Sequence, residues 1–139
     1  MGSSSTVKAA TVYDHMQGVV VTQLTPYFSI ENIEFTDVQA EGTIVERDYA
    51  LVKQFNVALV PHTVSGTSRK QIASIIVELN YGKGKAETAR NVANSISHYF
   101  SGTSFEHDII IDSVTSNTYD NASGSKAVVV IDFNYLVRV

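Results

Sequence analysis

Four histidines are the side chains best suited to acid–base or metal chemistry near neutral pH: His15, His62, His98 and His107. None of them has a partner at the H-x-x-x-H spacing that places two imidazoles on one helix face. The one dense polar triplet is Glu106-His107-Asp108, which we expect to open a strand. Because neighbours in a strand point to opposite faces, His107 would share a side with neither carboxylate. We therefore expect a solvated strand entrance there and no metal site.

A glycine-containing turn, Tyr81-Gly82-Lys83-Gly84-Lys85, precedes an expected helix. Glycines ahead of a helix can cradle phosphate, because free N–H groups and the helix dipole both favour an anion. However, neither G-x-x-x-x-G-K-[ST] nor G-x-G-x-x-G can be written here, and no serine lies in a G-x-S-x-G elbow. We expect a tight connection with exposed lysines. A nucleotide-binding enzyme that uses Gly82 to Lys85 is the lesser alternative.

The composition limits the remaining classes of function. The chain has 139 residues, 44% of them hydrophobic, and no cysteine, which excludes disulfides and thiolate chemistry. The formal charge of −4 and the scattered lysines and arginines argue against a protein that grips nucleic acid. No apolar run is long enough to cross a membrane. We expect no enzyme, with no catalytic residue, no metal and no cofactor.

Two segments have helical periodicity. In the first, apolar residues recur at steps of three and four: Ala9, Val12, Tyr13, Met16, Val19, Val20, Leu24 and Tyr27. Ser5 or Thr6 can cap its start, and Pro26 lies near its end. The second apolar face contains Ala86, Ala89, Val92, Ala93, Ile96, Tyr99 and Phe100, and Gly102 lies where a C-terminal glycine belongs.

Elsewhere apolar residues alternate with a period of two, as in half-buried antiparallel strands. The long runs cover 54–59, 73–81 and 129–138, with a further strand at 109–114 and a short edge strand at 33–38. Residues 1–5 are expected to form a flexible tail ahead of one domain, 6–139. The predicted fold class is α+β, with two helices on one face of a mainly antiparallel mixed sheet.

Two polar connections of about ten residues, Pro61–Lys70 and Thr115–Ser125, exceed the usual hairpin length of roughly 2–5. Long hairpin arms on a compact body commonly reach a partner, although mobile loops without a role are an equal alternative. If the chain is an assembly subunit, we expect these arms to contact other subunits. The predicted interface residues are Val64, Arg69, Lys70, Tyr119 and Asp120.

From Tyr49 to Val139 the chain resembles the tail-terminator and tail-completion proteins of long-tailed bacteriophages. The resemblance lies in the strand and turn Ile75–Gly84, the alanine-rich helix from Ala86 to Phe100, and the closing strand Val128–Tyr135. The leading helix, which ends in Leu24-Thr25-Pro26-Tyr27-Phe28, also fits the pattern. Head-completion and neck connector proteins share much of this layout, so they remain an alternative.

The resemblance implies a structural virion protein that is assembled in the host cytoplasm and lies in the tail or neck. Copies would close into a ring, commonly a hexamer, that caps the tail tube and ends its polymerisation. The ring would contact the tail tube protein on one side and a head-completion or neck protein on the other. DNA would pass through its channel without specific binding, which suits a net negative chain.

Overall fold

The structure is a computed structural model that describes residues 6–7, 9–35, 48–61, 68–121 and 124–138. Its helices are α1 (Ala9–Leu24) and α2 (Ala86–Gly102), with short 3-10 turns at Ile30–Asn32 and Glu106–Asp108. Its strands are β1 (Thr6–Val7), β2 (Ile33–Phe35), β3 (Tyr49–Pro61), β4 (Ser68–Tyr81), β5 (Ile110–Asn121) and β6 (Gly124–Arg138). Among these residues, no helix is long and apolar enough to cross a membrane.

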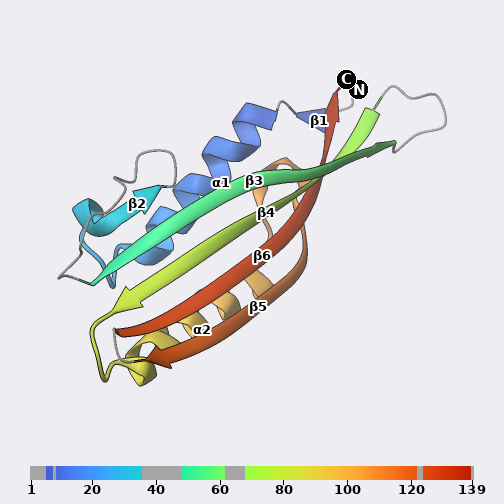
Figure 1. Ribbon diagram of the computed structural model, residues 1–139. Helices are drawn as coiled ribbons and strands as arrows, with labels where there is room; N and C mark the ends of the chain where they lie inside the picture. The colour runs from blue at the N-terminus through green and yellow to red at the C-terminus, as the bar shows by residue number, and fades with distance from the viewer. Residues whose placement is uncertain (1–5, 8, 36–47, 62–67, 122–123, 139) are drawn as a thin grey trace.

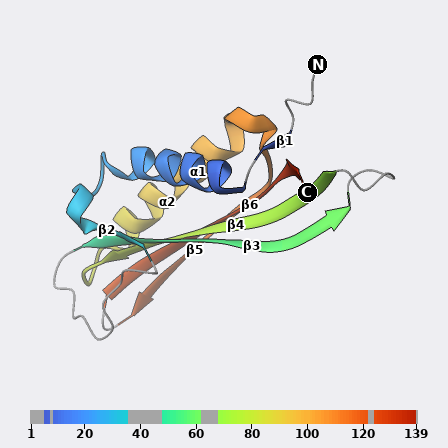
Figure 2. The ribbon, with the colours of Figure 1, turned by 90° about the horizontal axis from the view of Figure 1, so that it is seen from above.

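All the strands join one sheet whose long members are antiparallel (Figure 1). β6 pairs with β4 along one side and with β5 along the other, and β3 lies outside β4. The short strands are parallel additions, with β1 beside the end of β6 and β2 beside the start of β3. Both helices cover the same face of the sheet (Figure 2). This confirms the predicted α+β class and the mainly antiparallel mixed sheet.

The core lies between the helices and that face of the sheet. On α1 the buried positions follow a spacing of four residues, and on α2 they include Ala89 and Ala93, which allow a close approach to β5 and β6. The inward row of each central strand is fully buried, as at Ile75 and Val77 on β4 and Ile131 and Phe133 on β6. Each such apolar side chain contributes about 1.5–3 kcal/mol relative to exposure.

Several local predictions about the helices were wrong. Thr6 does not cap the first helix, because it belongs to β1 and pairs there with Leu136 of β6. Ser5 lies outside the described residues. The buried stripe of α1 is narrower than predicted, since Tyr13 and Tyr27 are 40% and 46% exposed. Gly102 is the last residue of α2, and the chain leaves the helix through an extended Thr103 without a left-handed glycine.

The predicted connections are shorter than the sequence suggested. β4 already begins at Ser68, so Arg69 and Lys70 belong to a strand. Nearly all of Thr115–Ser125 belongs to the paired strands β5 and β6. The Glu106–Asp108 segment is a 3-10 turn in which His107 and Asp108 have φ values of 65° and 54°, so it does not open a strand. The predicted short strand 33–38 is described only as far as Phe35.

Candidate assembly surfaces

The structure does not bring the predicted interface residues together. Arg69 and Lys70 lie near the start of β4, where they pair with Val137 and Leu136 at the end of β6. Tyr119 pairs with Lys126 at the opposite end of β6. The β3–β4 and β5–β6 hairpins therefore point away from opposite ends of the sheet (Figure 1).

Individually, these residues differ in their surroundings. Tyr119 is 51% exposed on β5, as an interface residue should be. The neighbouring Asp120 accepts a hydrogen bond of 2.9 Å from the Ser125 hydroxyl. Ser125 Oγ in turn accepts a 3.2 Å bond from the Lys85 N–H, so Asp120 helps to hold the β5–β6 hairpin against the start of α2. Val64 lies outside the described residues.

The outer edge of β3 carries exposed apolar side chains. β2 pairs only with Ala50–Val52, and no described residue pairs with the outer side of β3 from Lys53 to Pro61. Along this stretch Phe55, Val57 and Leu59 are 45%, 57% and 54% exposed. An unpaired edge with apolar side chains is a ready template for another strand.

A β-bulge interrupts the β3–β4 pairing between Asn56 and Ala58. Because the bulge changes which residues share a face, Leu59 lies opposite Gln71 although Phe55 lies opposite Ser74. The sequence alternation of Phe55, Val57 and Leu59 predicted a single half-buried face. The structure instead distributes these side chains around an exposed edge, a placement that the alternation alone does not reveal.

The second unpaired edge of the sheet is the outer side of β5. Within the described residues, β5 pairs only with β6, and most of its side chains are polar and exposed. From Thr103 to Asn121 the chain contains four acidic residues and no lysine or arginine. From Lys53 to Val77, which includes β3 and most of β4, it contains three basic residues and no acidic one. The two edges of the sheet therefore differ in the sign of their charge.

A hollow of about 490 Å³ lies beside the start of β5. Its apolar lining includes Phe105 and the run Ile109–Ile111, while Ser101, Thr103 and Ser104 add polar groups from the end of α2 and the following turn. Ile110 is 59% exposed, so apolar surface remains open to solvent here. The hollow thus combines an apolar lining with a neighbouring strand edge.

The sheet face away from the helices carries a polar network. Glu78 lies between two lysines, with its carboxylate 2.8 Å from Lys53 Nζ and 3.4 Å from Lys126 Nζ. Burial alone would raise the pKa of Glu78, but the hydrogen bonds and positive charges of the lysines outweigh it and lower that pKa. Nearby, Asp132 accepts hydrogen bonds from the hydroxyls of Ser74 and Ser113. These contacts link β3, β4, β6 and β5 across the sheet.

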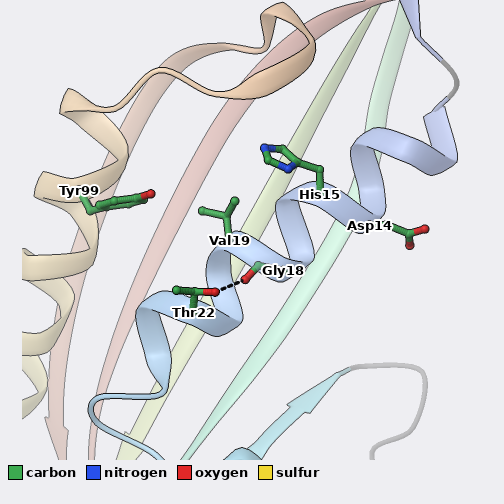
Figure 3. A pocket seen from close by; sticks show the side chains of 6 residues that line it. All are labelled: Asp14, His15, Gly18, Val19, Thr22 and Tyr99. Atoms are coloured by element: carbon green, nitrogen blue, oxygen red, sulfur yellow. Dashed lines mark hydrogen bonds between the residues drawn. The ribbon is translucent and has the colours of Figure 1, made fainter.

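A groove of about 370 Å³ separates the two helices (Figure 3). His15, Val19 and Thr22 point from α1 toward Tyr99 on α2, whereas Asp14 points away. The Thr22 hydroxyl donates to the Gly18 carbonyl of its own helix, at 2.9 Å. His15 meets His107 edge to face, with ring centroids 5.7 Å apart. Among the described residues no group of three potential ligands could hold a metal ion.

The turn before α2 holds a carboxylate of the chain itself. Asp48 accepts a 3.1 Å hydrogen bond from the Gly82 N–H and forms a 3.0 Å ion pair with Lys85. Burial, followed by the charges of Asp48 and Tyr27, raises the pKa of neighbouring Tyr81 to about 12. Because Asp48 occupies donors that a phosphate would need, the geometry favours a plain strand-to-helix connection.

Neither a scan against models of known protein families nor a search of curated protein sequences finds a match for this chain. The features that stand out among the described residues are the two unpaired strand edges and the hollow beside β5.

Proposed function

We propose that this chain is a structural subunit that assembles with other copies into a ring, as the tail terminator of a long-tailed bacteriophage. The observation that carries the proposal is the outer edge of β3, nine residues long from Lys53 to Pro61, with three exposed apolar side chains. Such an edge is a liability in a solitary protein and a contact element in an assembly. The sequence resemblance to tail-terminator proteins supplies the biological setting.

The arrangement of the sheet supports a closed assembly. The two strand edges that no described residue pairs with lie on opposite sides of one sheet and have different side chains, so a contact between them is heterologous. Heterologous contacts generate rings when the rotation between neighbours closes, and filaments when it does not. A subunit that ends tube polymerisation needs the closed form, and it needs a further surface that recognises the tube.

The charge of the chain suits a ring through which DNA passes. The net charge is −4 and the ten lysines and arginines are scattered along the sequence, whereas retention of a polyanion by counterion release calls for a concentration of basic residues. In this account the ring meets the tail tube protein on one side and a head-completion or neck protein on the other. DNA crosses the channel without sequence-specific contacts.

Light scattering after size exclusion, together with negative-stain microscopy, tests the ring directly. The proposal expects annular particles of uniform mass, either from the purified chain alone or after addition of tail tubes. Binding of those particles to tube ends supports a terminator, whereas binding only to DNA-filled heads assigns the ring to head completion. A chain that stays monomeric in the presence of both tubes and heads contradicts the proposal.

A further inference from the structure

We infer that the ring joint is made by the β3 edge of one copy and the β5 edge of the next, with Leu59 seated in the hollow beside Ile109. This inference rests on the proposed ring-forming function and names the contact that builds the ring. The occupant of both surfaces is a second copy of this chain. Strand direction, level in the sheet and charge complementarity support it independently.

Strand direction is the first support. Successive strands alternate in direction across β3, β4, β6 and β5, so β3 and β5 run in opposite directions on the two sides of the sheet. In a head-to-tail contact between copies of the same orientation, β3 of one copy lies antiparallel to β5 of its neighbour. The joint therefore continues the antiparallel sheet from one subunit into the next, as strand addition does in other complexes.

The levels of the two surfaces also match. Leu59 pairs with Gln71, and Gln71 pairs with Tyr135, which belongs to the core. Directly opposite residues in antiparallel strands share a face, so Leu59 lies on the helix-covered side at the level of Tyr135. On the far side of β6, Ile110 pairs with Asn134, which places Ile109 at that same level. The hollow and Leu59 thus lie at one height on opposite edges.

Equal height matters because of the symmetry of a ring. If the strands run along the ring axis, the rotation that relates neighbours leaves every residue at its own height. Leu59 of one copy then meets the hollow of the next copy without a shift along the strands. Leu59 is 54% exposed in the single chain, and the hollow offers Phe105 and Ile111 as apolar partners. Their contact removes apolar surface from water on both copies.

Charge complementarity favours the same joint. Lys70 on β4 pairs with Val60 near the end of β3, and the neighbouring Arg69 pairs with Pro61. The acidic turn Glu106–Asp108 comes directly before Ile109 on the β5 side of the sheet, where β1 pairs with Leu136 and Val137 of β6. Head-to-tail contact therefore brings basic groups toward acidic ones, whereas β3–β3 or β5–β5 contacts would bring like charges together. Such complementarity selects the partner surface and its register.

Engineered cysteines test the joint, because the natural chain contains none. We would combine Leu59→Cys with Ser101→Cys, Thr103→Cys or Ser104→Cys, each of which lines the hollow. These three positions lie at the end of α2 and in the following turn, beside the start of β5, and within one chain β5 is separated from β3 by three strand spacings, roughly 14 Å. A disulfide requires Cα atoms within about 7 Å, so any bond that forms joins two chains.

The expected result is a ladder of covalent oligomers on a non-reducing gel for at least one of the three double variants. Each single variant should remain a monomer on that gel, because a heterologous joint never brings two copies of one position together. Leu59→Cys combined with Thr88→Cys, an exposed site on α2, is the matched control and should give no ladder.

The outcomes separate this inference from the proposed function. If rings form but all three double variants stay uncrosslinked, the inferred joint is wrong and the ring-forming function stands. A covalent dimer of Leu59→Cys alone would also overturn the inference, because it reports a β3–β3 contact. Failure of the wild-type chain to form rings, even with tail tubes and heads, would overturn the proposed function itself.

Discussion

Leu59 and Gln71 lie directly opposite each other in the β3–β4 ladder, yet Gln71 is 7% exposed and Leu59 is 54% exposed. The Gln71 amide is held by the backbone, since its Nε2 donates to the Ala58 carbonyl at 2.9 Å. A polar residue is thus buried beside an apolar residue that remains in water. This reversal of the usual burial of polar and apolar side chains is explained if Leu59 becomes buried in the assembled protein.

The first prediction concerns Leu59→Glu. Because the side chain is exposed in the single chain, we expect the free energy of unfolding to change by less than about 1 kcal/mol. Assembly should be lost, since a carboxylate would enter an apolar hollow beside acidic residues. Urea unfolding and light scattering measure the two effects separately. Ile30→Glu is the matched control, because Ile30 is 66% exposed outside both edges, and it should assemble normally.

A second prediction concerns the charges along the joint. Lys70→Glu should weaken each joint by about 0.2–1 kcal/mol, the range of an exposed ion pair, and lower the salt concentration at which rings dissociate. Lys83→Glu makes the same charge change on the exposed turn before α2 and should leave the salt midpoint unchanged. Sedimentation at increasing sodium chloride measures the midpoint. Equal effects of the two substitutions would show that the salt midpoint depends on the net charge of the chain and not on the position of Lys70 in the joint.

The third prediction concerns acid stability. Because the folded chain lowers the pKa of Glu78, the unfolded chain binds that proton more readily. The resulting stability is present above the unfolded pKa of about 4.3 and is lost as the pH falls through the lower folded pKa. Glu78→Gln should therefore be less stable than wild type at pH 7, and the difference should shrink in acid. Urea unfolding across this range measures it, with exposed Glu31→Gln as a control that should show little difference.

The fourth prediction concerns the β5–β6 hairpin. Gly124 has a φ of 152°, and a Cβ there would lie 2.7 Å from the Tyr81 carbonyl oxygen. Gly124→Ala should therefore cost about 1–3 kcal/mol of folding free energy. Gly18→Ala is the control, because a Cβ at this position of α1 would meet no atom within 4 Å. This substitution should stabilise the chain by about 0.5–1 kcal/mol. Equal stabilities for the two variants would contradict the strain at Gly124.

The helices and the central strands could be predicted from the sequence, because their burial follows a regular period. Met16 and Val20 repeat at helical spacing, and Ile75 and Val77 alternate along a strand that is covered on one face. The second half of β5 could not be predicted in this way. Thr115, Ser116 and Asn117 pair with β6 through the backbone while their side chains are exposed, so no apolar period marks them.

The candidate surfaces were only partly predictable for a different reason. Tyr119 was expected to be exposed, and it is. The exposure of Leu59 follows from the bulge near Val57, which is not encoded in the alternation of β3 itself. The match between Leu59 and the hollow depends on the registers of three strand pairs, which only the folded chain defines.

The most direct measurement of the central claim is the mass and shape of the purified chain, alone and with tail tubes and heads. Light scattering and negative-stain microscopy should show closed annular particles built from identical subunits, and these particles should disappear in Leu59→Glu but persist in Ile30→Glu. A wild-type chain that remains monomeric under all of these conditions would contradict the account.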